Sequence, residues 1–93
     1  MIDVKEAVKI ALDYLGQLYD QTQLQDLRLE EVALSDDESY WYVTIGFSRP
    51  IPPRDLIHAL AEVVEQPQYQ REYKIFQIDS ATGQVRSMKI RAA

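Results

Sequence analysis

Residues 73–90 read Tyr-Lys-Ile-Phe-Gln-Ile-Asp-Ser-Ala-Thr-Gly-Gln-Val-Arg-Ser-Met-Lys-Ile, and they carry the most structural information in the chain. Two runs of strand-forming residues flank the five residues from Asp79 to Gly83. An Asp at the start of such a turn bonds to the backbone that follows it, and a Gly closes the turn where φ must be positive. The stretch therefore predicts a β-hairpin with strands over about 70–79 and 84–91.

A second strand pattern, Tyr-Trp-Tyr-Val-Thr-Ile-Gly-Phe-Ser, lies at residues 40–48. Its larger apolar residues occupy every second position from Trp41 to Phe47, which predicts that this set faces the core. The following segment, 49–53, contains three prolines. Because proline lacks an N–H, we expect this segment to end the strand and form a stiff crossover.

Residues 27–34, Leu-Arg-Leu-Glu-Glu-Val-Ala-Leu, form a strand pattern with a slip in phase. Leu27 and Leu29 share one parity, whereas Val32 and Leu34 share the other. One extra residue near Glu30 would bring all four side chains to one face, so the pattern predicts a β-bulge there.

Two segments have helical periodicity. Residues 3–19 repeat apolar side chains at three- and four-residue steps, with Asp3 as the expected N-cap and Glu6 in the capping-box position. Residues 53–65 are apolar on one side, begin with a proline suited to a first helical turn, and are followed by Gln66-Pro67.

The predicted fold class is α+β, in the order α-β-β-α-β-β, as one domain over residues 1–93. A four-stranded antiparallel sheet carries the first helix on one face, and the second helix lies between strands two and three. The predicted core consists of Val8, Leu12, Leu15, Trp41, Val43, Ile45, Phe76, Ile78, Met88 and Ile90.

Composition and charge disfavour several classes of binding partner. The chain has 93 residues, no cysteine and a net charge of −5. Residues 1–47 carry three basic and ten acidic residues, whereas residues 48–93 carry seven basic and five acidic ones. The acidic balance disfavours nucleic acid as a partner, and no apolar run approaches the roughly 20 residues of a membrane span. With no signal-peptide pattern at the start, we expect a cytoplasmic protein that binds neither nucleic acid nor membrane.

Few residues offer chemistry. The single histidine, His58, has no cysteine or second histidine to work with, and the three glycines are too scattered for a phosphate-binding loop. We therefore expect no metal, no cofactor and no enzymatic activity. The enzyme alternative is a carboxylate-dependent hydrolase that would use Glu30, Glu31 and Asp36.

Tyrosine is the informative residue type. Tyr40, Tyr42, Tyr73 and Ile75 have the parity opposite to the core residues of their strands, so we expect them on the second sheet face. Tyrosine is frequent in protein interfaces, which predicts a face that binds a protein partner or a second copy. Two alternatives stay open: this is plain sheet surface, or the helix at 53–65 covers it.

Residues 73–85 resemble the closing hairpin of PepSY-like domains, in which an apolar strand, Asp-x-x-Thr-Gly and another strand follow an opening helix rich in Ala and Val. The segment 4–11 matches that helix. The resemblance implies a cystatin-like arrangement of sheet and helix, and an inhibitory or binding role. The sequence thus predicts a non-enzymatic protein-binding or regulatory module, with an inhibitor- or immunity-type protein that acts on an enzyme as the alternative.

Overall fold

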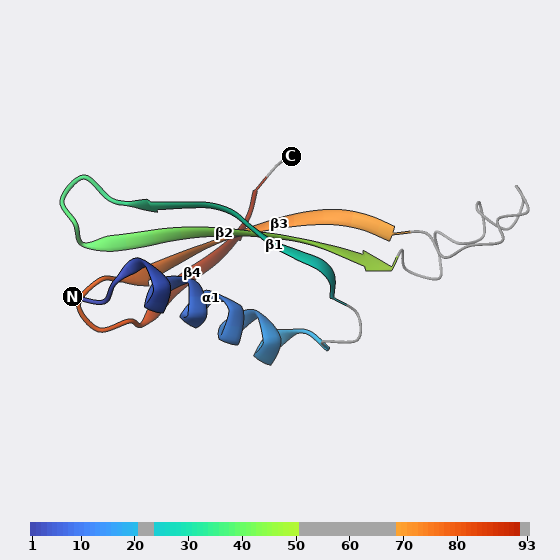
Figure 1. The fold of residues 1–93 in the computed structure, drawn as a ribbon, viewed down its shortest axis with the longest axis horizontal. Helices are drawn as coiled ribbons and strands as arrows, with labels where there is room; N and C mark the ends of the chain where they lie inside the picture. Colours follow the sequence, from blue (N-terminus) through green and yellow to red (C-terminus); the bar gives the residue numbers. More distant parts are fainter. Residues whose placement is uncertain (21–23, 51–68, 92–93) are drawn as a thin grey trace, which may run out of the picture.

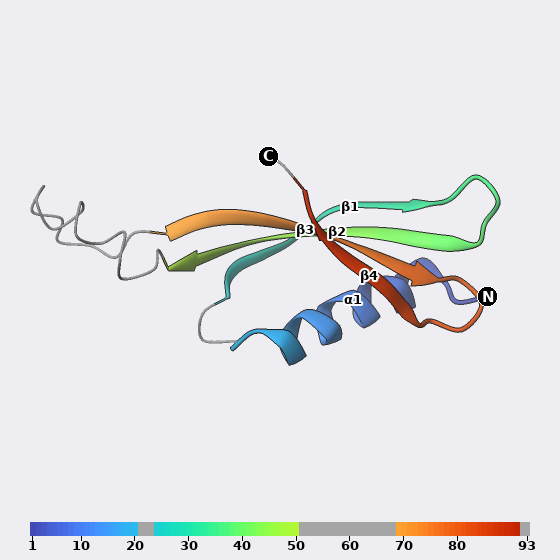
Figure 2. The ribbon, with the colours of Figure 1, turned by 180° about the vertical axis from the view of Figure 1, so that it is seen from behind.

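The computed structural model describes residues 1–20, 24–50 and 69–91. The elements in these ranges are α1 (Val4–Leu18), β1 (Gln25–Leu34), β2 (Tyr40–Pro50), β3 (Tyr69–Asp79) and β4 (Val85–Ile90). The strands form one antiparallel sheet in the order β1-β2-β3-β4, and α1 lies along one face of it (Figures 1 and 2). The α+β class and the four-stranded antiparallel sheet are confirmed. The second helix predicted at 53–65 lies outside the described residues.

Helix α1 begins where the sequence predicts. The Asp3 carboxylate accepts a hydrogen bond of 2.8 Å from the Glu6 backbone N–H, as an N-cap does. Ala7, Ala11 and Leu15 follow at four-residue steps and are the buried residues of the helix. Two of these three are small, so the helix backbone can approach the sheet closely.

The predicted β-bulge is present in β1. Leu29 pairs with Ile45 and Val32 pairs with Val43, with a register shift between Leu29 and Glu31. A second shift lies between Gln25 and Arg28. Together these shifts keep the leucines and valine of β1 on the side of the sheet that carries α1.

Strand β2 is longer than the sequence predicts. The expectation that it ends before Arg49 is wrong, because Arg49 pairs with Gln70 and Pro50 pairs with Tyr69. Pairing with β1 stops at Ser48. Beyond that point β2 has a described neighbour only on the β3 side, and proline is tolerated at the edge and end of a strand.

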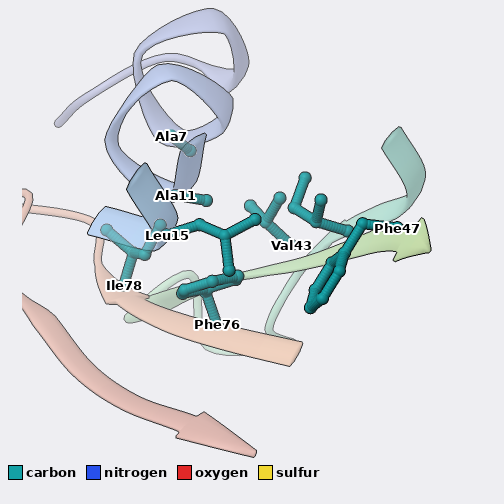
Figure 3. Packing of buried hydrophobic residues seen from close by; sticks show 8 residues of the cluster. Ala7, Ala11, Leu15, Val43, Phe47, Phe76 and Ile78 are labelled. Carbon is teal, nitrogen blue, oxygen red and sulfur yellow. The ribbon is translucent and has the colours of Figure 1, made fainter. Parts of the chain in front are cut away.

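The core lies between α1 and the two central strands (Figure 3). Its fully buried members are Ala7, Ala11, Leu15, Val43, Ile45, Phe47, Phe76 and Ile78. Val8, Trp41 and Met88 are partly buried and pack against this cluster.

The predicted burial of two residues is wrong. Leu12 is 40% exposed and Ile90 is 78% exposed. Leu12 lies on the flank of α1 that faces β1, where the helix leaves space. Ile90 is the last residue of the edge strand β4, where few described neighbours can cover it.

The closing hairpin follows its predicted turn chemistry. The Asp79 carboxylate accepts hydrogen bonds from the backbone N–H groups of Ala81 (2.8 Å) and Thr82 (3.0 Å), and Gly83 has a φ of 77°. Ser80 ties the turn to the rest of the fold: its backbone N–H donates to the Ser39 carbonyl (2.9 Å). The hairpin is thereby anchored to the β1–β2 turn.

Candidate functional site

The sheet has a second face, opposite α1, which we call the outer face. Residues on this face alternate along each strand with those that contact α1, because successive strand side chains point to opposite sides. By register, the outer face includes Arg28, Glu31, Ala33, Tyr40, Tyr42, Thr44, Gly46, Ser48, Pro50, Tyr69, Arg71, Tyr73, Ile75, Gln77, Asp79, Ser87 and Lys89.

All four residues predicted to form a partner-binding face lie on the outer face. Tyr40 and Tyr42 are on β2, and Tyr73 and Ile75 are on β3. Tyr42 is exposed, and the other three are partly buried. The Tyr42 hydroxyl accepts a hydrogen bond of 3.4 Å from the side-chain amide of Gln77, its register partner on β3. The structure therefore brings the predicted residues together on two adjacent strands.

Sequence reasoning missed two residues of this face, Tyr69 and Arg71. They precede Tyr73 at steps of two along β3, so the alternation that placed Tyr73 also places them. The Tyr69 hydroxyl accepts a hydrogen bond of 3.2 Å from the Gln25 side chain at the start of β1. The predicted strand at about 70–79 already includes Arg71, and extending it by one residue would have added Tyr69.

Arg71 organises one end of the outer face. Its guanidinium contacts the Glu30 carboxylate at 3.0 Å and the Asp26 backbone carbonyl at 2.7 Å, and it lies 5.8 Å from the centre of the Tyr73 ring. An ideal Cβ on Gly46 would stand 2.6 Å from a carboxylate oxygen of Glu30. Glycine at this position thus leaves room for the Arg71–Glu30 ion pair to lie flat on the sheet.

The carboxylates named for the hydrolase alternative do not share a partner. Glu30 pairs with Arg71, Glu31 stands opposite Thr44 in the register, and Asp36 lies in the turn after β1. Within residues 1–20, 24–50 and 69–91, no group of three His, Cys, Asp or Glu side chains could hold a metal ion. His58 lies outside the described residues.

The acidic turn between β1 and β2 has a structural explanation. The Asp37 carboxylate accepts hydrogen bonds from the Ser39 backbone N–H (3.0 Å) and the Ser35 hydroxyl (2.8 Å). These bonds favour the charged form and lower the pKa of Asp37. A general acid needs its pKa raised, so this carboxyl is suited to holding a turn.

On the other side of the sheet, α1 leaves two hollows along β1. One has a volume of about 430 Å³ and is lined by Leu12, Asp13, Leu15, Gly16, Leu24 and Leu27. The other, of about 320 Å³, is lined by Val4, Lys5, Val8 and Leu29. Leu27 and Leu29 are about half exposed there. An apolar surface therefore remains beside α1, separate from the outer face.

The end of the sheet where β2 leaves the described residues is anchored to α1. The Arg49 guanidinium contacts the Glu72 carboxylate, with Nε at 2.7 Å from Oε2 and Nη2 donating to Oε1 at 3.1 Å. It also lies 5.3 Å from the centre of the Tyr19 ring, which packs on Phe47. Arg49, expected in a crossover, is therefore a strand residue held on the α1 side.

Comparison of the chain with protein-family models, with curated proteins and with solved structures finds no match in any of the three. In the described part of the chain, α1 is too short and too polar to cross a membrane.

Proposed function

We propose that this protein is a small, non-enzymatic cytoplasmic module that binds a protein partner through the outer face of its sheet. The observation that carries the proposal is the gathering of four tyrosines and Arg71 on β2 and β3, on the face away from α1. Tyrosine and arginine are the residue types that concentrate in protein interfaces and supply much of their binding free energy. An inhibitor- or immunity-type protein would use the same face against an enzyme.

Side chains of the outer face also have contacts within the chain that can hold them in place. The strands hold Tyr42 and Tyr73 by backbone pairing, and the contacts of Arg71 with Glu30 and Asp26 fix its guanidinium beside Tyr73. Immobilising a flexible side chain on binding costs about 0.5–1.5 kcal/mol, so side chains that are already positioned favour affinity. These contacts support recognition by a rigid surface.

The proposal includes a second helix at residues 53–65, between β2 and β3, that docks beside α1. The two hollows between α1 and β1 support this site, since they offer apolar side chains such as Leu27 and Leu29 to an amphipathic helix. The chain leaves the sheet at Pro50, two residues after Ser48, which pairs with Gln25 at the start of β1. A helix in that place leaves the outer face free for a partner.

The PepSY-like resemblance of residues 73–85 remains part of the proposal. The resemblance implies a cystatin-like arrangement of sheet and helix, and the presence of α1 on the sheet and the turn from Asp79 to Gly83 support this part of the proposal. The binding role that the resemblance implies agrees with the outer face as the contact surface. The hydrolase alternative, which would use Glu30, Glu31 and Asp36, has less support, because Glu30 is paired with Arg71.

A Tyr42→Glu/Tyr73→Glu double variant tests the outer face. A partner is identified by affinity capture from the native host and purified, and its Kd is measured for the parent and the variant. Loss of two interface tyrosines should weaken binding at least about 30-fold, given roughly 2 kcal/mol for one such central residue. A Gln17→Glu/Gln84→Glu variant, with the same charge change at exposed positions on α1 and in the β3–β4 turn, is the control and should bind like the parent.

Circular dichroism is measured on every variant. Parent-like binding by a folded double variant would refute the use of the outer face. If the double variant unfolds, Tyr42→Ser/Tyr73→Ser replaces it, because serine introduces no charge. If the serine variant also unfolds, the tyrosines belong to a covered surface, and the proposal fails.

A further inference from the structure

One row of the outer face crosses all four strands. Glu31 on β1 pairs with Thr44 on β2, Thr44 with Ile75 on β3, and Ile75 with Lys89 on β4. The row thus has an acid at one edge of the sheet, a base at the other, and two uncharged residues between them. Neighbouring strands lie about 4.8 Å apart, so the backbones of Glu31 and Lys89 are roughly 14 Å apart and these two residues do not pair within one chain.

Both end residues are exposed and unpaired in the described part of the chain, where none of the ion pairs involves Glu31 or Lys89. The other acids of this edge differ, since Asp26 and Glu30 both contact Arg71. In the middle of the row, Thr44 is only 2% exposed and Ile75 is partly buried. The row therefore has an uncharged, largely buried centre between two opposite charges that form no ion pair in the described part of the chain.

This row is complementary to a rotated copy of itself. When two such faces stack with a two-fold axis parallel to the strands, β1 of one copy lies over β4 of the other. Glu31 then faces Lys89 of the second copy, twice by symmetry, and Thr44 faces Ile75. A two-fold axis across the strands would instead place Glu31 over its own equivalent, which opposes association.

We propose that the outer face pairs with the outer face of a second copy, about a two-fold axis parallel to the strands. This inference rests on the proposed function of that face and names its partner. Stacked sheets pack about 10 Å apart, a gap that the side chains of Glu31 and Lys89 can bridge from opposite sides. In this dimer Tyr42 lies over Gln77 of the second copy, because those two residues are register partners within each sheet.

The size of the face is adequate for a dimer. Four strands span about 19 Å across, and the 11 residues of β2 extend about 36 Å along the strand. Because β4 is shorter, the stacked footprint is roughly 600 Å² on each copy, and side-chain relief adds accessible area to it. Stable interfaces bury about 800 Å² per partner, so pairing over the whole face approaches the standard size.

Charge reversal tests the pairing. Glu31→Lys and Lys89→Glu are made separately, mixed together, and combined in one chain, and dimer dissociation constants are measured by sedimentation. Each single variant places like charges at both symmetry-related contacts and should weaken the dimer about tenfold or more. An equimolar mixture of the two single variants should recover the parent affinity as a heterodimer, and so should the combined variant as a homodimer.

The controls are Asp13→Lys and Lys9→Glu, which make the same charge changes at an exposed pair on α1 and should leave the dimer unchanged. A parent that stays monomeric at millimolar concentration would overturn the inference, and so would a dimer that is insensitive to both reversals. Polymers larger than a dimer would overturn it too, since they indicate pairing of β1 and β4 edges in an open chain. A monomeric parent whose purified partner still requires Tyr42 and Tyr73 would leave the proposed function standing.

Discussion

Replacing Phe76 with Ala tests the position of the core and the register of β3 together. The Phe76 side chain is 0% exposed. Its ring makes an edge-to-face contact with the ring of Tyr14, with the two centroids 6.0 Å apart and an interplanar angle of 82°. Its register partners are Val43 on β2 and Met88 on β4. Removing a fully buried Phe side chain costs about 3–5 kcal/mol, through lost apolar burial and the cavity that remains.

The neighbouring residue provides the matched comparison. Ile75 is next in the chain but lies on the outer face, where it is partly buried. We expect Ile75→Ala to cost about 2 kcal/mol or less, because about 2 kcal/mol is the low end of the range for truncating a buried Ile to Ala and Ile75 is only partly buried. Because a shift of one residue in register exchanges the two faces of a strand, the difference between the two variants reports directly on the register.

The measurement is equilibrium unfolding in urea, followed by the fluorescence of Trp41. The midpoint should fall far more for Phe76→Ala than for Ile75→Ala, with an unchanged dependence on urea concentration. Small domains have total stabilities of roughly 5–15 kcal/mol, so Phe76→Leu serves as the milder variant if Phe76→Ala is unfolded. A loss for Ile75→Ala that equals or exceeds the loss for the Phe76 variant would refute the assignment of the core face.

Three further predictions concern the turns and the edge of the core. Gly83→Ala should lower the free energy of unfolding by about 1–2 kcal/mol, because an L residue is strained at a φ of 77°. Gly83→Asn should lower it less, and equal losses in thermal unfolding would contradict this prediction. Trp41→Phe should lower the free energy of unfolding by about 0.5–1.5 kcal/mol, because it removes the hydrogen bond of 3.2 Å that Trp41 Nε1 donates to the Ile2 carbonyl. Unchanged stability in urea would argue against that bond. Hydrogen bonds from the backbone N–H groups of Thr82 and Ala81 lower the pKa of Asp79 below its usual 3.8, so this carboxylate adds stability above about pH 4 that disappears as the pH falls through the folded-state pKa. Asp79→Asn should therefore flatten the loss of stability between about pH 5 and pH 2 in urea titrations, and a curve parallel to that of the parent would exclude this role.

Local structure was predictable where the interactions that stabilise a segment lie within that segment. Asp3 and the N–H that it caps are three residues apart, and Asp79 and Gly83 form one turn. The bulge in β1 was predictable because the phase of the apolar pattern changes near Glu30. The assignment of Tyr42 and Tyr73 to one face followed from alternation alone, since each strand has only two faces.

Burial was predictable less well, because it depends on what lies above each side chain. Leu12 fits the apolar pattern of α1, yet the helix lies over the central strands and leaves Leu12 beside a hollow. Ile90 has the parity of a core residue but ends an edge strand. The extension of β2 through Pro50 was missed because proline is expected to end a central strand. Beyond Ser48, β2 pairs with β3 and no longer with β1, and this depends on how the strands are arranged in the sheet.

The amino-acid pattern was enough to predict the first helix, the strands, the closing turn and the parity of the tyrosines, because each depends on contacts within a few residues. Which residues of different strands stand side by side depends on the packing of the whole fold. The contact of Arg71 with Glu30 joins residues 41 positions apart. The row from Glu31 to Lys89 likewise depends on three strand registers at once, and these are set by how the strands pack against α1 and against one another.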